Sequence, residues 1–329
     1  MSYSSSSALK AQGDLTPITP MGSVTAIINP MNTSETLLFY CTDTYNLAVE
    51  HRALNQSAQS TEYTDNNVQN GNITQPGDFA VVRQNNVIQC YGVTNFTGGD
   101  GKVANVASGI SPSINPIDQI VNTKGSPPSS PALTGTYSAL AATTDGTFND
   151  YVTFIGPNPA NPALPQLIEY SININATSFQ PYPTASVQIL PQTRLAICYR
   201  TDDPNHNRFI LGQMNSGGNP IGYMSTDEGA MNPIKGTNNA SAGNPMAVTT
   251  AKNPEGQMNM YLFYMDNGNN LNKVIYNGTK KRWGDPNQVA NNVQIGSGIA
   301  VVNDGTSCYA FYAKTGAKVF TMYTGPLDD

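Results

Sequence analysis

The sequence predicts an all-β fold, a six-bladed β-propeller whose blades are four-stranded antiparallel sheets. The first observation is composition: the 329 residues include 29 glycines and 23 prolines, and only 12% are charged, which is typical of short strands joined by turns. The second is a strand–turn–strand pattern that recurs six times at a spacing of about 54 residues, as in propellers and solenoids. The third is an aromatic residue at the matching place in every repeat, although only 9% of the chain is aromatic.

The first strand of each repeat is rich in small residues, which suit the crowded innermost strand around a propeller axis. These strands are SVTAIINP from Ser23, DFAVVRQN from Asp78, YSALAATTD from Tyr137, ASVQILPQ from Ala185, PMAVTTAKN from Pro245 and SGIAVVND from Ser297. Residues 1–329 are therefore expected to form a single propeller domain, with blades that start near residues 23, 78, 137, 185, 245 and 297.

The second strands carry the aromatics, which are expected to fill the widening space between blades. They read TLLFYCT, VIQCYGV, DYVTFIG, RLAICYR, MYLFYMD and CYAFYAK, with Tyr40, Tyr91, Phe154, Tyr199, Tyr264 and Tyr312 at the matching place. The third strands follow as LAVEHR, KVANVA, LIEYSI, RFILGQ, KVIYNG and KVFTMY. The last repeat ends after three strands, so a strand within Ser4–Gln12 is expected to complete it, close the ring and remove exposed sheet edges.

Two other architectures remain alternatives. A solenoid coil needs only about 20 to 45 residues, whereas a four-stranded blade matches the observed spacing. A β-sandwich or a pair of small barrels fits the strand content but gives no reason for a six-fold aromatic register. The propeller is therefore preferred.

Charge and composition exclude several classes of protein. The net charge is −6 and the one basic cluster is short (279–283), so a nucleic-acid surface is not expected. No run of about 18 apolar residues occurs, so no membrane span is expected. The four cysteines are far apart and fit no metal-binding spacing; separate buried thiols are expected, with no metal and no cofactor. The compartment stays open, because secretion after signal removal and a cytosolic location both fit.

The repeats resemble those of the fungal fucose-specific lectins, which are six-bladed propellers. The resemblance lies in the succession SGIAVVNDG, CYAFYAKTG and KVFTMYTG, and in YLFYMDNGNN followed by NKVIYNGTKKRW, and it covers about Ser23 to Tyr323. It implies sugar sites between adjacent blades, each with an Arg-Glu pair on a third strand and a stacking Trp or Tyr. Arg donates a fork of hydrogen bonds and Glu accepts from hydroxyls.

This chain departs from that pattern, because no third strand contains Arg-Glu. The nearest matches are Glu50 in LAVEHR and Glu169 in LIEYSI, and Trp283 is the one tryptophan. At fold and composition level the chain also resembles the lectin-like fungal hetero-Diels–Alderases of tropolone-sesquiterpenoid pathways. That resemblance implies an apolar small-molecule substrate, a terpenoid or tropolone-like compound, held in the central funnel.

The candidate catalytic residues lie in RTDDPNHNR (200–208), expected to be a loop between the second and third strands of the fourth repeat at one mouth of the channel. His206 is a candidate general acid, with Asp202 beside it, and Arg200 or Arg208 would hydrogen-bond a developing oxygen charge. The alternative is a solvated polar loop.

The candidate binding residues come from other repeats. Strand alternation places Glu50 and Arg52 on one face and His51 on the other, as part of a degenerate sugar site or as a surface ion pair. Glu169 is the second candidate sugar contact. Trp283 is expected either to stack on a ligand or to pack an outer strand.

Two functions follow from these observations. The first is a non-hydrolytic enzyme of fungal secondary metabolism that orients a quinone-methide-like partner and a terpenoid alkene for a hetero-Diels–Alder cycloaddition in the funnel. The alternative is a fucose- or glycan-binding lectin with degenerate inter-blade sites and no catalysis.

Overall fold

The computed structural model describes residues 23–41, 47–55, 61–65, 73–74, 78–97, 103–111, 115–117, 133–135, 137–158, 160–173, 177–203, 205, 207–317 and 319–327. Nearly all regular structure in these ranges is β-strand, grouped into six separate antiparallel sheets. Within the same ranges, no helix is long and apolar enough to cross a membrane. The six sheets are called blades one to six in chain order.

Blades one to three come from the first half of the chain. Blade one contains β1 (Val24–Ile28), β2 (Glu35–Cys41), β3 (Leu47–Ala53) and β4 (Thr61–Asp65). Blade two contains β5 (Phe79–Gln84), β6 (Val87–Thr97), β7 (Val103–Ser111), β8 (Asn115–Pro116) and β9 (Leu133–Gly135). Blade three contains β10 (Leu140–Thr144), β11 (Asn149–Asn158), β12 (Asn161–Asn173) and β13 (Thr177–Pro181).

Blades four to six complete the molecule. Blade four contains β14 (Leu195–Tyr199), β15 (Arg208–Gln213), β16 (Ile221–Ser225) and β17 (Asn232–Pro233). Blade five contains β18 (Met246–Lys252), β19 (Met258–Met265), β20 (Leu271–Asn277), β21 (Arg282–Trp283) and β22 (Asn287–Ala290). Blade six contains β23 (Ile299–Asn303), β24 (Ser307–Ala313) and β25 (Phe320–Pro326).

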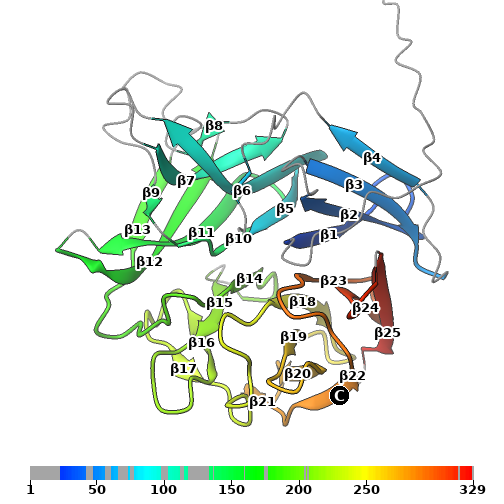
Figure 1. The fold of residues 1–329 in the computed structure, drawn as a ribbon. Coiled ribbons are helices and arrows are strands. Elements are labelled where there is room, and N and C mark those ends of the chain that lie inside the picture. The colour runs from blue at the N-terminus through cyan, green and yellow to red at the C-terminus, as the bar shows by residue number, and fades with distance from the viewer. Residues whose placement is uncertain are drawn as a thin grey trace, which may run out of the picture.

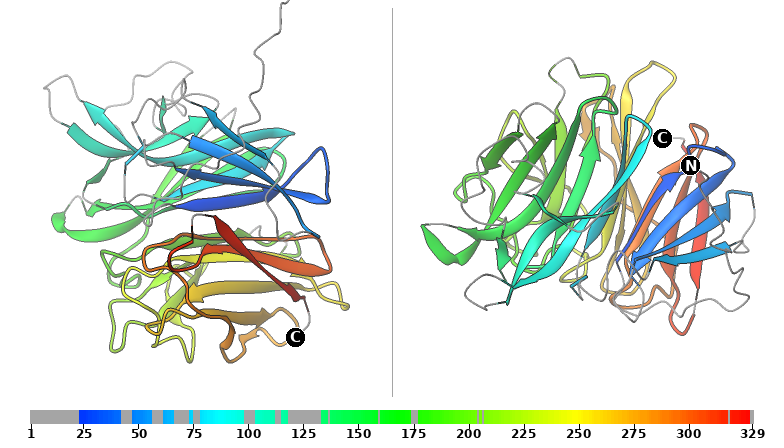
Figure 2. Two further views of the ribbon diagram at one scale, coloured as in Figure 1. Left: turned by 45° about the vertical axis from the view of Figure 1, so that its right-hand side comes forward. Right: turned by 90° about the horizontal axis from the view of Figure 1, so that it is seen from above.

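The six sheets are arranged in a ring. Their first strands β1, β5, β10, β14, β18 and β23 lie around a common centre, and each contacts the first strand of both neighbouring blades. The colours in Figure 1 run once around this ring, so red blade six lies beside blue blade one. The two further views in Figure 2 show the same neighbours side by side. The ring therefore closes through contact between β1 and β23.

The predicted aromatic register is present in five blades. Each aromatic pairs with a residue at the start of the innermost strand; the pairs are Tyr40 with Val24, Tyr91 with Ala80, Phe154 with Leu140, Tyr264 with Met246 and Tyr312 with Ile299. All five rings are at most 2% exposed. The recurring aromatic is therefore a packing residue of the scaffold.

Blade four departs from the predicted strand assignment. The segment expected as its first strand, from Ala185, makes only an isolated bridge at Ile189, and the innermost strand is β14, which was expected to be the second. Gly212 stands opposite Leu195, where other blades have an aromatic. A Cβ at Gly212 would lie only 3.1 Å from the Ile189 side chain, so the displaced segment fills the space of the missing ring. Tyr199 is consequently the last residue of an innermost strand.

The number of strands differs between blades. Among the described residues, blades one, three and four have four strands, blades two and five have a fifth, and blade six has three. The strand expected within Ser4–Gln12 lies outside the described residues, so closure of blade six by that strand stays a prediction.

The hydrophobic core lies between blades and not within one central mass. Each of its five clusters joins residues from adjacent blades; Tyr40 of blade one, for example, meets Phe320 of blade six with ring centroids 5.5 Å apart. The four cysteines are free and buried, as predicted. Adjacent blades therefore pack face to face through apolar side chains.

Candidate functional site: the clefts between blades

Glu169 and Arg208, which the sequence analysis assigned to two different candidate sites, contact each other across the interface of blades three and four. Glu169 lies on β12 and Arg208 opens β15. The guanidinium donates from Nε to Glu169 Oε2 at 3.0 Å and from Nη2 to Oε1 at 2.6 Å, a bidentate pair. The Glu169 side chain is 4% exposed and that of Arg208 is 17% exposed. The pair forms between neighbouring blades, which is why no Arg-Glu dipeptide is present in the sequence.

Two tyrosines support this ion pair. The Tyr182 hydroxyl donates to Glu169 Oε1 at 3.4 Å, and the Arg208 guanidinium carbon lies 4.1 Å from the centre of the Tyr151 ring. Burial raises the pKa of Tyr182, and the charge of Glu169 adds to this, so the phenol stays protonated. Burial alone would lower the pKa of Arg208, but hydrogen bonding to Glu169 raises it on balance, and the guanidinium stays charged.

A cleft of about 410 Å³ lies over this ion pair. It is termed the three–four cleft and is lined by Glu169, Gln180, Tyr182, Pro183, Asn207, Arg208, Thr226, Asp227 and Gly229. The lining combines a guanidinium, two carboxylates, two amides and two hydroxyl groups. Such a set offers both donors and acceptors to the vicinal hydroxyls of a sugar, and the cleft has the size of a small-ligand pocket.

The second candidate pair, Glu50 and Arg52, is not part of any such cleft. Arg52 donates from Nε to Glu50 at 2.7 Å and from Nη1 to the carbonyl of Phe320 at 2.6 Å, and both residues are at most 2% exposed. The predicted alternation is confirmed, since His51 points the other way and lies 3.6 Å from Glu35. Because Glu50 and Arg52 are sealed between blades one and six, neither can reach a sugar.

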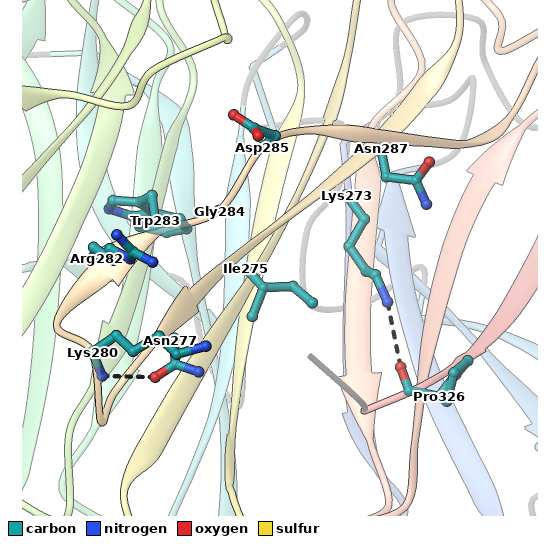
Figure 3. Close-up of a pocket in the computed structure, with 10 residues that line it drawn as sticks. All are labelled: Lys273, Ile275, Asn277, Lys280, Arg282, Trp283, Gly284, Asp285, Asn287 and Pro326. Carbon is teal, nitrogen blue, oxygen red and sulfur yellow. Dashed lines mark hydrogen bonds between the residues drawn. The ribbon is translucent and has the colours of Figure 1, made fainter.

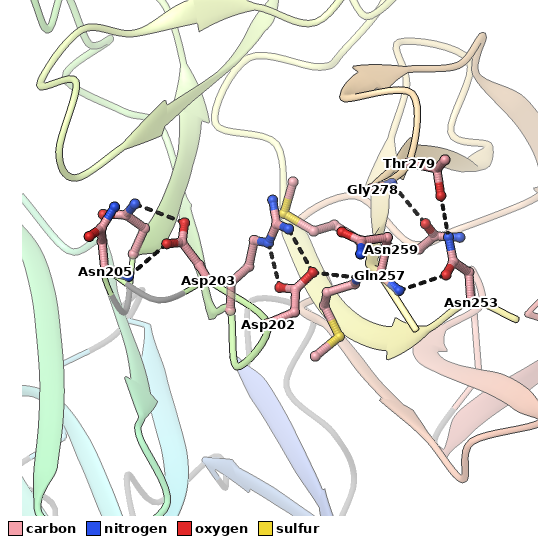
Figure 4. Close-up of polar contacts among 12 residues, drawn as sticks. Asp202, Asp203, Asn205, Asn253, Gln257, Asn259, Gly278 and Thr279 are labelled. Atoms are coloured by element: carbon pink, nitrogen blue, oxygen red, sulfur yellow. Dashed lines mark hydrogen bonds and ion pairs between the residues drawn. The ribbon is translucent and has the colours of Figure 1, made fainter. Parts of the chain in front are cut away.

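Arg200 and Asp202 form a clamp between blades four and five. Arg200 donates from Nε and Nη2 to the two Asp202 oxygens at 2.8 and 2.7 Å, and Asp202 Oδ2 also accepts the backbone N–H of Met258 at 2.7 Å (Figure 4). Burial opposes ionisation of Asp202, but these hydrogen bonds outweigh it and lower its pKa. Each Asp202 oxygen therefore accepts a hydrogen bond from Arg200, and one also accepts from the Met258 backbone.

The loop that carries this clamp differs in position from the expectation. It joins β14 to β15, the first and second strands of blade four. The loop therefore lies at the end where the innermost strands finish, whereas the expectation placed it at the end where the innermost strands begin. His206 lies outside the described residues, so its catalytic role stays a prediction. Arg208, from the end of the same loop, lies in the three–four cleft.

Trp283 lies beside a second opening, between blades five and six. Its ring makes edge contacts with Tyr223 and Tyr276 at 5.6 and 5.5 Å. The opening is termed the five–six pocket, holds about 480 Å³ and is lined by Lys273, Ile275, Asn277, Lys280, Arg282, Trp283, Gly284, Asp285, Asn287 and Pro326 (Figure 3). Trp283 thus packs on an aromatic cluster and also forms part of a pocket wall.

The central channel is narrow. Residues of all six innermost strands line a space of about 140 Å³, well below the ~300–1,000 Å³ typical of small-molecule sites. At the end where these strands begin, Arg194 of blade four reaches Asp78 of blade two at 2.5 Å, and Ser23 of blade one donates to the same Asp78 oxygen at 3.0 Å. The channel therefore gives the expected funnel ligand little room.

Sequence reasoning missed several residues of these sites. Tyr182 and Asn207 of the three–four cleft, Lys273 of the five–six pocket and Arg194 at the channel end were not selected. Glu169 and Arg208 were selected, but the shifted strand assignment of blade four concealed that they face each other. In the part of the chain that is described, no three His, Cys, Asp or Glu side chains are grouped to hold a metal ion.

Comparison with solved structures identifies the fold. AofleA from Arthrobotrys oligospora superposes with a TM-score of 0.67, covering 95% of this chain and 85% of that one at 14% identity. The fucose-specific lectin from Aleuria aurantia, described as a six-bladed β-propeller, superposes with a TM-score of 0.63 over 95% and 97% of the two chains, also at 14% identity. The chain has the fold of a six-bladed lectin propeller. At this identity the likeness concerns the fold alone.

Two curated proteins are also similar in sequence to this chain. Both are named wall-associated proteinase, one from Coccidioides immitis and one from Coccidioides posadasii, and each is 29% identical over 254 residues, which cover 77% of either chain. No protein-family model matches. The propeller is therefore similar in sequence to fungal proteins that are named for an association with a wall.

Proposed function

We propose that the protein binds carbohydrate in the three–four cleft. The observation that carries the proposal is the Arg208–Glu169 pair, which joins two blades beneath an open polar cleft and has Tyr182 against it. This is the combination of guanidinium fork, carboxylate acceptor and aromatic that sugar recognition requires. The fold supports the same proposal, because several solved structures of this fold are lectins described with fucosides.

The proposed specificity is for a fucose-like monosaccharide with neighbouring hydroxyls. A deoxysugar presents hydroxyls to Arg208 and Glu169 and an apolar edge to the Tyr182 side of the cleft. Glu50 and Arg52, the other matching pair, are buried, so this cleft is the proposed single site of that type among the described residues. Binding would accordingly be that of one site without multivalent enhancement.

The test combines a glycan array with a titration of soluble fucose. The wild-type protein is expected to bind fucosylated glycans, and Arg208→Ala to weaken binding at least about tenfold, because a charge-assisted hydrogen bond contributes ~1.5–3 kcal/mol. Arg208→Lys keeps the charge but loses the fork and is expected to weaken binding as well. Arg83→Ala, an exposed arginine of blade two, is the matched control. Absence of binding on the array would rule the proposal out.

The cycloaddition expected from the sequence has less geometric support. It requires an apolar chamber large enough to hold a terpenoid and its partner together, and the central channel holds about 140 Å³. Neither Arg200 nor Asp202 is among the residues that line this channel, so they are poorly placed to act on a substrate there. Incubating the protein with a terpenoid alkene and a quinone-methide precursor is expected to give product at the rate and stereoisomer ratio of buffer alone.

Proteolysis, suggested by the name of the curated relatives, has no evident nucleophile in the described thiols. All four are buried, and burial raises the pKa of Cys90 and of Cys198 to about 12, so these two are protonated and unreactive at neutral pH. A casein digestion assay with the purified protein is expected to show no cleavage that depends on a thiol, so alkylation of the cysteines with iodoacetamide should leave the result unchanged.

A further inference from the structure

The five–six pocket has a charge opposite to that of the molecule. Three cationic side chains, Lys273, Lys280 and Arg282, line it with one carboxylate, Asp285, although the whole chain has 16 lysines and arginines against 22 aspartates and glutamates. Figure 3 shows Lys273 on the wall next to β25 and Lys280 and Arg282 across the pocket. A positive cavity in an acidic protein attracts anions selectively.

Lys273 is the unusual member of this set. Its side chain is only 9% exposed, and its ammonium donates to the carbonyl of Pro326 at 3.4 Å. Within the described part of the chain, no carboxylate lies within ion-pair distance of it. A buried charge is normally paired or bound to a ligand, because its desolvation is costly. One long hydrogen bond to a neutral carbonyl compensates this ammonium poorly.

The register of the blades relates Lys273 to the three–four cleft. In blade five, Lys273 lies opposite Phe263, which lies opposite Ala247, the second residue of the innermost strand β18. In blade three, Glu169 lies opposite Thr153, which lies opposite Ala141, the second residue of the innermost strand β10. The same scaffold position therefore carries an acid between blades three and four and a base between blades five and six.

The position that faces this one from the next blade also differs in charge between the two sites. Arg208 pairs with Tyr199, the fifth residue of β14, and in blade six the fifth residue of β23 pairs with Cys308. Burial raises the pKa of Cys308, so a neutral thiol stands where the three–four cleft has a guanidinium. Glu169 has a protein counter-ion, whereas the equivalent place opposite Lys273 supplies no charge.

The remaining lining resembles that of a sugar site. Asn277, Asn287 and Asp285 can pair with hydroxyls, and Ile275 provides apolar surface, while Trp283 forms part of the wall with its ring turned toward Tyr223 and Tyr276. The volume of about 480 Å³ falls within the ~300–1,000 Å³ range of small-ligand pockets.

We propose that the five–six pocket binds an anionic saccharide, whose carboxylate or sulfate is held by Lys273 and whose ring lies against Ile275. Lys280 and Arg282 increase the local concentration of the anion from the opposite wall. This second site has a specificity different from that of the three–four cleft and does not depend on ligand binding there.

The test uses the fluorescence of Trp283, the one tryptophan of the chain, which lines this pocket and does not line the three–four cleft. The protein is titrated separately with galactose 6-sulfate, glucuronate, galactose and inorganic sulfate. Galactose 6-sulfate or glucuronate is expected to bind at least about tenfold more tightly than galactose and than inorganic sulfate, and binding is expected to weaken as salt is raised. The two anionic sugars distinguish a sulfate site from a carboxylate site.

Variants locate the effect. Lys273→Met fills a similar volume without the charge and is expected to weaken anionic-sugar binding at least about tenfold. The double variant Lys280→Gln with Arg282→Gln, at exposed positions, is expected to weaken it less and to reduce its salt dependence. Lys235→Met, an exposed lysine of blade four, is the matched control. Thermal melting of each variant shows whether the fold is retained.

Three outcomes would overturn the proposal. They are affinity for galactose equal to that for both anionic sugars, affinity for inorganic sulfate equal to that for the tighter-binding anionic sugar, and binding unchanged in both Lys273→Met and the double variant. Loss of fucose binding in Arg208→Ala with this fluorescence response retained would show that the two sites are independent.

Discussion

Two Arg-Glu pairs of identical composition differ in the exposure of the arginine, whose side chain is 17% exposed in Arg208 and 1% exposed in Arg52. Arg208 and Glu169 lie at the base of an open cleft, where a ligand can compete for their hydrogen bonds. Arg52 and Glu50 are sealed between blades one and six, where Arg52 also lies 5.8 Å from the ring centre of Phe311. The first pair is therefore the one proposed to contact a ligand, whereas the second joins two blades through the carbonyl of Phe320.

The buried pair gives a prediction about stability. Arg52→Met leaves the Glu50 carboxylate buried without its guanidinium and is expected to lower the free energy of unfolding by about 3–5 kcal/mol. Urea denaturation measures this. Glu50→Leu combined with Arg52→Met removes both charges and is expected to recover most of the loss. His51→Ala, on the exposed face, should cost less than about 1 kcal/mol; an equal loss in all three variants would contradict the argument.

At the residue scale, the sequence predicted which side chains share a face of a strand, but it did not predict which residues of different blades contact each other. Period two is a local property of a strand, so the opposite faces of Glu50 and His51 could be predicted from LAVEHR alone. The Glu169–Arg208 contact joins residues 39 positions apart on different sheets. It depends on how two blades pack, and no pattern within one strand encodes that packing.

At the scale of elements, two hairpins share the sequence Asp-Gly-Thr and the same turn. In the β10–β11 turn Asp145 Oδ1 accepts backbone N–H groups of Thr147, Phe148 and Asn149 at 2.8 to 3.0 Å. In the β23–β24 turn Asp304 Oδ1 accepts those of Thr306 and Ser307 at 2.8 Å. Gly146 and Gly305 have φ of 79° and 91°, a region that favours glycine. Each carboxylate thus organises the turn between an innermost strand and its neighbour.

These turns predict a loss of stability in acid. Burial acts against ionisation, but the backbone hydrogen bonds lower the pKa of Asp145 and of Asp304 to about 2, from an ordinary value of 3.8. A lowered pKa in the folded state adds stability above pH 3.8 that is lost as the pH falls toward 2. Thermal melting between pH 2 and 7 should show a fall in Tm below pH 4, and a smaller fall in Asp304→Asn and Asp145→Asn.

The exposed Asp285→Asn serves as the control for this pH series, since no such turn surrounds that residue. If Asp304→Asn had the Tm of wild type at pH 7 and the same acid profile, the turn carboxylate would contribute nothing to stability.

Strand assignment from the sequence succeeded where a blade follows the common pattern. In blade four it was wrong by one strand, because ASVQILPQ has the alternation of a strand but packs Ile189 over Gly212 instead of pairing in the sheet. A glycine at the aromatic position of RFILGQ was the local signal of this change. Periodicity cannot distinguish a segment that pairs from one that only covers a core.

At the scale of the whole molecule, one carboxylate ties three blades together. Asp78 of blade two receives hydrogen bonds from Arg194 of blade four and Ser23 of blade one, and its other oxygen has no partner among the described residues. Burial raises the pKa of Asp78, although Arg194 and Ser23 act to lower it. The ring is thereby braced across the end of its channel.

This brace predicts a pH-dependent variant. In Arg194→Met the pKa of Asp78 should rise further, because the charge that opposes burial is gone. A raised pKa in the folded state adds stability that is complete below pH 3.8, the ordinary pKa. This stability is lost as the pH rises through the raised pKa of the folded state. The Tm deficit of Arg194→Met against wild type is therefore expected to grow from pH 3.5 to pH 7. Asp78→Asn combined with Arg194→Met should remove this dependence; a deficit that is constant with pH would contradict the argument.

The hydrogen bond from Arg52 to the carbonyl of Phe320 spans 268 residues of chain. During synthesis, blade one emerges first, yet its buried guanidinium and Tyr40 ring acquire their last partners only when β25 has left the ribosome. Long-range contacts of this kind form slowly, because the entropy of closing the loop is lost first. A nascent chain arrested before Phe320 should thus be cut by protease within blade one, at sites that the complete ring protects.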